Sequence, residues 1–244
     1  MCRAASSSNT SLTELDALTK TALMPASRFK FERALLEQGV TLIAGVDEAG
    51  RGPLAGPVVA AAALLPLAWM HSGLPRALRG LNDSKQLTPE QREGYFGFLT
   101  TCCEVCFGVA WADAATIDTI NILQATHRAM NEALAQLQPA PQHSLVDGLQ
   151  VMSLRFPQTA IVDGDAKSYS IAAASVIAKV TRDRMMIEFD RQFPQYRFAE
   201  HKGYGTPEHL AILAEHGPCP IHRRSFAPVH QPELNLFGSA SLDS

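Results

Sequence analysis

The feature that most constrains the fold of this chain is a set of acidic residues placed directly at the ends of apolar segments. Asp47 and Glu48 end the segment "TLIAGVDE", Asp147 ends "SLVD", and Asp163 and Asp165 end "TAIVDGD". The apolar density and β-branched residues of these segments predict β-strands. Carboxylates are strongly disfavoured in buried strands unless something compensates their charge. We therefore expect several acids to meet at one edge of a sheet.

Strands and helices alternate along the rest of the chain. The apolar segments predict five strands, at 41–47, 56–66, 103–112, 144–148 and 159–165. Apolar or small residues at helical spacing, together with capping signals, predict helices at 88–99, 121–137, 168–193 and 206–217. The first strands follow one another without a long helix between them, which favours an α/β fold with a mixed central sheet flanked by helices. The sequence Thr88-Pro89-Glu90-Gln91 also predicts a capping box.

Length and composition indicate one globular domain. The chain has 244 residues, of which 46% are apolar and 18% charged. We expect a flexible leader at 1–28, a catalytic domain at 29–230 and a short tail at 231–244. The longest apolar runs are about ten residues, against the ~20 that cross a bilayer. The N-terminus lacks the apolar core of a signal peptide, so we expect a cytoplasmic protein without a membrane anchor.

The five cysteines fit a reducing compartment. Cys102, Cys103 and Cys106 lie too far from other cysteines or histidines for a zinc site, and we predict that they are small buried residues of a strand. A net charge of -3 gives no general attraction to nucleic acid, so a polyanionic partner requires a local basic patch. No motif indicates an oligomer, and we expect a monomer.

The acidic strand ends favour a site for hard metal ions. Clustered carboxylates without nearby histidine or cysteine are typical ligands of Mg²⁺ or Mn²⁺. Two such ions, about 4 Å apart, are the usual machinery for hydrolysing a phosphodiester. Basic residues that could contact phosphates lie in the later segments: Lys85, Lys167, Lys179, Arg182, Lys202, Arg223 and Arg224. Each of them alone could equally be a solvated surface charge, and each Asp-Gly pair alone could be a simple turn.

The segment "GVDEAGRGPLAG" excludes two nucleotide-binding loops. Arg51 and Gly52 stand where a phosphate-binding loop needs lysine and a hydroxyl residue, and the glycine spacing is not that of a dinucleotide fold. One geometrical question remains in this segment. Neighbouring strand residues face opposite sides, so Asp47 and Glu48 can share a metal site only through a break in the strand or through the longer reach of Glu48. We expect a strand broken between Asp47 and Gly52, with both carboxylates facing Asp147 and Asp165.

Six segments in consistent order resemble the bacterial ribonuclease HII family: "GVDEAGRGPLAGPVV", "LNDSKQLTPEQRE", "LVDG", "VDGDAKSYSIAAASVIAKVTRDRMM", "HKGYGTPEHL" and "PIHRRSFAPV". They extend from about Thr41 to Val229. The resemblance implies a ribonuclease H-like fold with a C-terminal helical region. It also implies a metal-dependent endonuclease, using Mn²⁺ or Mg²⁺, that cuts the RNA strand of RNA/DNA hybrids and cuts 5′ of ribonucleotides embedded in duplex DNA.

The resemblance assigns roles to individual residues. The four catalytic and metal-binding acids of the family correspond to Asp47, Glu48, Asp147 and Asp165. The resemblance further implies that the following residues bind substrate: Gly50, Arg51 and Gly52, which read the ribose 2′-hydroxyl through the backbone, Tyr204, which packs on the next deoxyribose, and Lys85 and Lys179, which lie near phosphates. Glycine suits close backbone approach, and the 2′-hydroxyl distinguishes RNA from DNA.

Two further acids match the motifs but are excluded from the site. Asp163 stands at a position that varies in the family. Asp183 lies well along a helix, and we predict that it forms an ion pair with a neighbouring basic residue. The run His222-Arg223-Arg224 could be a nucleic-acid patch or could pack within the fold.

The tail contains Leu234, Leu236 and Phe237, which resemble the short peptides that dock on bacterial sliding clamps; the alternative is that these side chains pack on their own domain.

Two other functions stay open at this point. One is another nuclease of the same fold, such as a junction resolvase or an exonuclease, which has no need to detect a 2′-hydroxyl. The other is a non-catalytic module that binds RNA/DNA hybrids, although such a module gains nothing from four negative charges beside phosphates.

Overall fold

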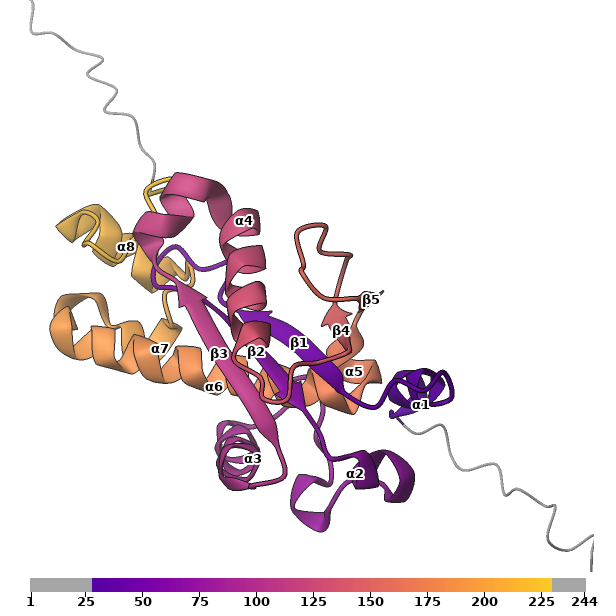
Figure 1. The fold of residues 1–244 in the computed structure, drawn as a ribbon. Coiled ribbons are helices and arrows are strands. Elements are labelled where there is room, and N and C mark those ends of the chain that lie inside the picture. Colours follow the sequence, from indigo (N-terminus) through magenta and orange to yellow (C-terminus); the bar gives the residue numbers. More distant parts are fainter. Residues whose placement is uncertain (1–27, 230–244) are drawn as a thin grey trace, which may run out of the picture.

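A computed structural model describes residues 28–229 and shows one mixed sheet with helices on both faces (Figure 1). The sheet has five strands in the order β3-β2-β1-β4-β5. Their bounds are β1 Ile43–Ala49, β2 Val58–Leu64, β3 Cys106–Ala112, β4 His143–Asp147 and β5 Gln158–Ile161. All five overlap segments whose apolar pattern predicts strands, but β5 ends at Ile161, before the predicted end at Asp165.

The pairing of the strands brings three carboxyl ends to one edge. β1 pairs antiparallel with β2, and β2 with β3, whereas β1–β4 and β4–β5 are parallel. The register places Val46 beside Val146 and Asp147 beside Ile161. Parallel strands end at the same edge of a sheet, so the segments that follow β1, β4 and β5 meet there. The mixed sheet expected from the sequence is confirmed.

Helices form a layer on each face of this sheet. α4 covers the face of β2 and β3, and α6 lies across β1 and β2 on the other face, with α3 packed against α6. The short helices α7 and α8 follow α6 and form the C-terminal helical region (Figure 1). The helix bounds are α1 Lys30–Leu36, α2 Leu67–Ser72, α3 Pro89–Thr101, α4 Ala114–Ala135, α5 Gly164–Lys167, α6 Tyr169–Gln192, α7 Phe198–His201 and α8 Pro207–His216.

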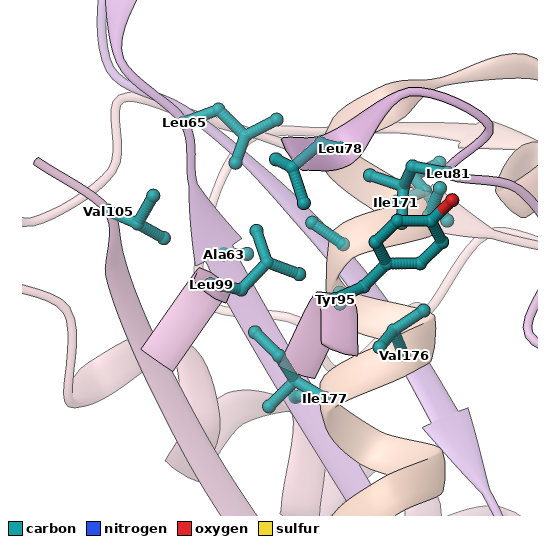
Figure 2. Packing of buried hydrophobic residues seen from close by; sticks show 14 of the residues in the cluster. Ala63, Leu65, Leu78, Leu81, Tyr95, Leu99, Val105, Ile171, Val176 and Ile177 are labelled. Carbon is teal, nitrogen blue, oxygen red and sulfur yellow. The ribbon is translucent and has the colours of Figure 1, made fainter. Parts of the chain in front are cut away.

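Small residues let α6 lie unusually close to the sheet. Every residue of β2, "VVAAAAL", is buried, and α6 buries an uninterrupted run from Ser170 to Ala178. At Gly45 in β1, a Cβ atom would stand only 2.0 Å from the carbonyl carbon of Ser170. Figure 2 shows Ile171, Val176 and Ile177 of α6 packed among the larger side chains of the surrounding loops and of α3.

The sequence predicted the main helices well but missed details of their ends. The capping box is present: Gln91 N donates to Thr88 Oγ1 at 3.3 Å, and Thr88 N donates to Gln91 Oε1 at 2.9 Å. α4 begins earlier than expected and is interrupted at Asn121, whose φ of 66° is non-helical.

The expectation of buried strand cysteines is wrong for Cys102 and Cys103, because Cys102 follows the last residue of α3 and Cys103 is exposed in the turn before β3.

The predicted leader and the tail with Leu234, Leu236 and Phe237 lie outside the residues that the structure describes. Within residues 28–229, none of the helices combines the length and apolar character needed to cross a bilayer.

Candidate active site

Carboxylates from three separate segments converge where β1, β4 and β5 end. Asp47 and Glu48 lie near the C-terminal end of β1, and Asp147 is the last residue of β4. Asp165 lies in α5, the short helix that follows β5. Asp147 is central, because its charge acts on each of the other three carboxyl groups. The structure thus brings all four predicted acids together.

Burial and mutual repulsion make these carboxyl groups hard to ionise together. Burial, followed by the charges of Glu48 and Asp147, raises the pKa of Asp47 well above its ordinary value. Burial also raises the pKa of Glu48, although the nearby Arg51 partly opposes this. Burial and the charge of Asp147 raise the pKa of Asp165 to about 6. A cluster of this kind lowers its free energy by binding a cation.

The expected break in the strand lies further along than predicted. β1 remains regular through Ala49, with Asp47 paired to Ala61 and Glu48 to Ala60, so the prediction of a break beginning at Asp47 is wrong. The chain turns only at Gly50, whose φ is +95°. In a regular strand, Asp47 and Glu48 start out on opposite faces of the sheet. The charge of Asp147 nevertheless acts on Glu48, which we attribute to the longer reach of the glutamate side chain.

Local hydrogen bonds orient three of the carboxylates. Asp147 Oδ1 accepts from the Gly164 N–H at 2.6 Å, which ties the end of β4 to α5. Asp47 Oδ1 accepts from the Glu48 N–H at 2.6 Å, and Glu48 Oε1 lies 3.4 Å from Arg51 Nη1. Among the residues that the structure describes, no three acidic, histidine or cysteine side chains already form a group that would hold a metal ion. The acids share one neighbourhood without a preformed coordination sphere.

Lys85 is a cation within the electrostatic field of these acids. Burial lowers the pKa of its ammonium, but the charges of Asp83, Asp165, Asp47 and Asp147 outweigh this and raise the pKa above its ordinary value. The predicted phosphate-contacting lysine therefore lies beside the acids.

Asp83 is a residue of this site that sequence reasoning missed. It hydrogen-bonds to the side chain of Asp165 and contributes to the raised pKa of that group. It also accepts the Lys85 N–H at 2.8 Å, which fixes the turn on which Lys85 stands. The motif "NDSK" contains Asp83, but an acid in a turn normally only caps the turn, so no local signal points to the acid cluster.

Gly50, Arg51 and Gly52 begin a loop that extends to Pro57 and contacts the loop carrying Tyr204. Leu54 N donates to the carbonyl of Gly203 at 2.8 Å, and Tyr204 is 43% exposed beside this contact. The guanidinium of Arg182 lies 5.8 Å from the centre of the Tyr204 ring. The loop that begins with the glycine-flanked arginine and the loop that carries the predicted junction tyrosine, far apart in sequence, are therefore in contact.

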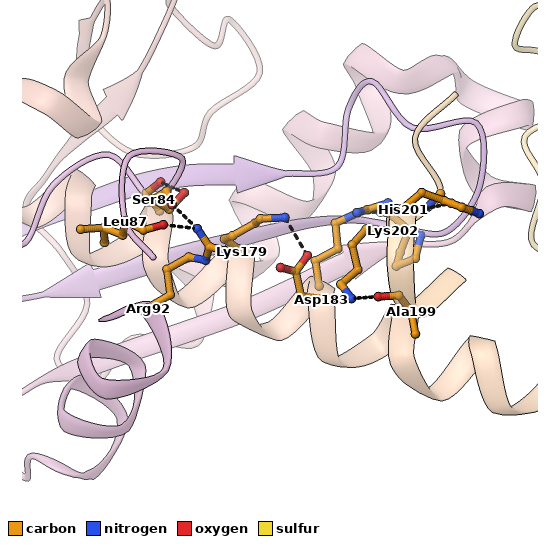
Figure 3. A network of polar contacts seen from close by, with 12 residues as sticks. Ser84, Leu87, Arg92, Lys179, Asp183, Ala199, His201 and Lys202 are labelled. Carbon is orange, nitrogen blue, oxygen red and sulfur yellow. Dashed lines mark hydrogen bonds and ion pairs between the residues drawn. The ribbon is translucent and has the colours of Figure 1, made fainter. Parts of the chain in front are cut away.

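Lys179 lies in a different polar network, shown in Figure 3. Its ammonium donates to Asp183 Oδ1 at 2.7 Å, and both side chains are 19% exposed. This ion pair confirms the prediction for Asp183. The side chain of the excluded Asp163 is 76% exposed, and its Oδ2 lies 3.8 Å from Lys167 Nζ.

The run His222-Arg223-Arg224 packs mainly within the fold. His222 and Arg223 are buried, and only Arg224 is exposed. His222 Nε2 lies 3.0 Å from His209 Nε2, and Cys219 Sγ lies 3.1 Å from His222 Nδ1. Packing, the second of the two interpretations that the sequence left open, holds for His222 and Arg223.

Known proteins resemble this chain along most of its length. Residues 44–229 match the family described as Ribonuclease HII. A curated Ribonuclease HII from Geobacter metallireducens is 54% identical over 205 residues, which cover 84% of this chain and 92% of that protein. The solved ribonuclease H2 of Pyrococcus horikoshii is 30% identical, with a TM-score of 0.62 over 77% of this chain and 95% of that one.

A more distant structure shares the fold at 24% identity. It has a TM-score of 0.61, covers 80% of this chain and 100% of that one, and is described as the PCNA:RNase HII complex from Archaeoglobus fulgidus. The ribonuclease H-like architecture expected from the sequence is thereby confirmed. Together with the family match over residues 44–229 and the 54% identity, it shows that this chain belongs to the ribonuclease HII family.

Proposed function

We propose that Asp47, Glu48, Asp147 and Asp165 are the catalytic carboxylates of a ribonuclease H that hydrolyses the RNA strand of RNA/DNA hybrids. The family and its structural relatives support an endoribonuclease acting on such hybrids. The finer activity that we propose is cleavage 5′ of a ribonucleotide embedded in duplex DNA.

One observation carries the assignment of the catalytic acids. Three strand ends deliver four carboxylates, three of which lie in the field of Asp147, and Lys85 and Arg51 are cations that act on this cluster. Burying so many like charges is unfavourable, and a fold that only needed stability would have apolar residues there. The cluster is therefore best explained as a site for divalent cations.

The donor chemistry fits Mn²⁺ or Mg²⁺, because the four groups offer only hard oxygen ligands. When bound, two such ions lower the pKa of the attacking water and neutralise the departing oxygen. The residues of the chain supply the rest. Asp147, held by the Gly164 N–H, fixes β4 against α5, and Lys85 is positioned to meet the scissile phosphate beside the acids.

The loop that begins at Gly50, next to the acids, is the part of the chain that we propose recognises the ribose. Gly50 follows β1 directly, so the backbone of Gly50, Arg51 and Gly52 stands next to Glu48, where a 2′-hydroxyl would lie during cleavage. Tyr204 adjoins this loop and exposes enough of its ring to pack on a sugar. The ammonium of Lys179 is already paired with Asp183, so its proposed contribution to phosphate binding is the smallest of these.

The test uses two duplexes that differ by one hydroxyl group. One carries a single ribonucleotide and the other is its all-DNA twin, each incubated with Mg²⁺ or Mn²⁺. We expect one cut, 5′ of the ribonucleotide, in the first duplex alone, and no cut after the metal is removed with a chelator. Equal cutting of both duplexes would indicate another nuclease of the same fold. Binding of hybrids without any cutting would indicate the non-catalytic module.

The tail suggests a partner. We propose that Leu234, Leu236 and Phe237 bind a sliding clamp, as the related archaeal structure is described in complex with PCNA. Deleting residues 233–244 should abolish binding to a bacterial clamp in a pull-down and leave nuclease activity unchanged. Full-length chain that fails to bind the clamp would rule this partner out. Both proposed partners imply a cytoplasmic location.

A further inference from the structure

Two arginines are completely buried beneath the loop at 50–57. Arg182 of α6 and Arg223 of the C-terminal segment both have 0% exposed area. Within residues 28–229 neither of them forms an ion pair with a carboxylate. Burying a guanidinium is unfavourable by several kcal/mol unless its donors are satisfied, so these two residues need a structural or functional reason.

Both guanidinium groups donate to backbone carbonyls of the loop. Arg223 donates from Nη2 to Gly50 O at 2.5 Å, from Nη1 to Arg51 O at 2.8 Å and from Nε to Gly56 O at 3.0 Å. Arg182 donates from Nε to Pro57 O at 2.9 Å and from Nη2 to Ala55 O at 3.1 Å. Five carbonyls of one short loop are thus held by two side chains that lie far away in sequence.

The contacts of Arg223 fix the direction of two amides. In a trans peptide the C=O group and the following N–H group point in opposite directions. Because the carbonyls of Gly50 and Arg51 point inward to Arg223, the N–H groups of Arg51 and Gly52 point outward. Both residues are exposed, and neither amide donates a hydrogen bond to any residue in the described part of the chain.

The space around the loop shows that the arrangement is tight. A Cβ atom at Gly50 would lie 2.0 Å from Arg182 Nε, and one at Gly203 would lie 2.5 Å from Ala55 O. Arg223 also donates its own backbone N–H to Leu54 O at 2.8 Å, and Gly56 N donates to Ile221 O at 2.8 Å. The loop is clamped between the segments around Gly203 and Arg223, so its peptide planes cannot rotate freely.

We infer that Arg223 is a positioning residue for ribose recognition. By holding the carbonyls of Gly50 and Arg51, it aims the free N–H groups of Arg51 and Gly52 at the 2′-hydroxyl of the substrate. Arg182 holds the second half of the loop. The inference rests on the proposed role of Gly50, Arg51 and Gly52. Lysine cannot replace Arg223, because the planar fork of a guanidinium is needed to hold three carbonyls at once. Arg182 uses two nitrogens of its fork to hold two carbonyls.

The experiment measures discrimination in binding rather than activity alone. Dissociation constants are measured in Ca²⁺, used to limit cleavage, for the duplex with one ribonucleotide and for its all-DNA twin. For Arg223→Lys we expect the ratio of the two constants to fall at least about tenfold, as for one lost hydrogen bond in a specific site. Affinity for the all-DNA twin should stay within about twofold, because non-specific phosphate contacts do not involve this loop.

A matched control separates this role from general stability. Arg33→Lys changes another partly buried arginine, which donates to Met70 O at 2.7 Å and contacts no residue of the site. We expect this variant to keep the discrimination of the unchanged protein. In steady-state cleavage of the ribonucleotide duplex, Arg223→Lys should raise KM and lower kcat, whereas partial unfolding would lower the active fraction and leave KM unchanged.

The possible outcomes distinguish this inference from the proposed function. If the unchanged protein binds both duplexes equally, the proposed ribose recognition is wrong. If it discriminates and folded Arg223→Lys discriminates equally well, only the positioning role is wrong. Should Arg223→Lys fail to fold, Arg182→Lys is measured instead. Because Arg182 holds only Ala55 O and Pro57 O, we expect a smaller loss of discrimination, and unchanged discrimination would contradict the role of the buried arginines in holding the loop.

Discussion

Asp47 shows how one residue can be constrained by two opposite requirements. Its side chain is only 5% exposed, it follows the apolar residues of β1, and its neighbours Glu48 and Asp147 carry the same charge. Stability would favour an apolar residue at this position. The carboxylate is therefore expected to be needed for catalysis rather than for folding.

Asp47→Asn keeps the shape of this side chain and removes its charge. We expect cleavage of the ribonucleotide duplex to fall at least about a thousandfold, corresponding to about 4 kcal/mol of lost transition-state stabilisation. Affinity for the duplex should change little. Single-turnover cleavage and equilibrium binding measure the two effects separately.

Asp163→Asn is the control for this substitution, because Asp163 follows β5 but exposes 76% of its side chain. Its activity should match that of the unchanged protein. Activity above about a tenth of normal in Asp47→Asn would disprove the assignment of Asp47 as a central metal ligand.

At the scale of elements, the close packing of α6 on β1 sets the position of the acids. α6 contacts β1 and β2 more extensively than any other helix does, and Gly45 permits this approach. Ser175 of α6 hydrogen-bonds to Asp47, so the distance between helix and sheet also determines where the carboxylate lies.

Gly45→Ala should force α6 away from the sheet, because its Cβ would meet backbone atoms of Ser170 at 2.0 Å. We expect the free energy of unfolding to fall by at least about 3 kcal/mol. Gly97→Ala in α3 is the matched control, since apart from its chain neighbours and the backbone of α3 itself nothing lies within 4 Å of its Cβ position. This change should stabilise the protein by about 0.5–1 kcal/mol, because alanine favours a helix interior. Urea denaturation of both variants checks the opposite signs.

At the scale of the whole molecule, buried histidines join the C-terminal segment to α8 and to the loop that carries Tyr204. His209 and His222 face each other at 3.0 Å, and His209 Nδ1 lies 2.9 Å from the carbonyl of Tyr204. Burial lowers the pKa of both groups, and that of His222 falls to about 4, with the neighbouring His209 as the next cause. The network therefore depends on neutral imidazoles.

The pKa of His222 is near the ordinary 6.5 in the unfolded chain and falls to about 4 in the folded chain, because burial disfavours the charged imidazolium. Stability from neutral His222 is therefore present above about pH 6.5 and is lost as the pH falls towards 4. The acids with raised pKa values have the opposite effect, because they make the folded state more stable as the pH falls. They contribute equally to the unchanged protein and to its His222→Gln variant, so they cancel in the difference between the two. We expect the stability difference between these two proteins to shrink by up to about 1.4 kcal/mol per pH unit over this window. Urea denaturation at about pH 7 and 5 measures the shrinkage, and a constant difference would contradict the role of His222.

The sequence by itself determined the strands, the long helices and the presence of acids at the strand ends, because these depend on local patterns. The resemblance to the family then selected Asp47, Glu48, Asp147 and Asp165 as the proposed catalytic acids. Apolar runs of strand length, capping residues and acids at strand ends can be read within a few neighbouring residues. Asp47, Glu48, Asp147 and Asp165 were predicted to converge at one sheet edge, and the parallel pairing of β1, β4 and β5 confirms this. The order of the motifs also indicated the family.

Only the tertiary structure decided how the site is supported. Asp83 reaches Asp165, Glu48 joins the cluster from an unbroken strand, and Arg223 holds a loop that lies more than 150 residues away in sequence. A buried arginine and an exposed one look alike in a sequence, since what distinguishes them is the set of atoms that the fold places around the guanidinium. Long-range contacts leave no local pattern, and for this reason the carboxylates could be predicted while the residues that position them could not.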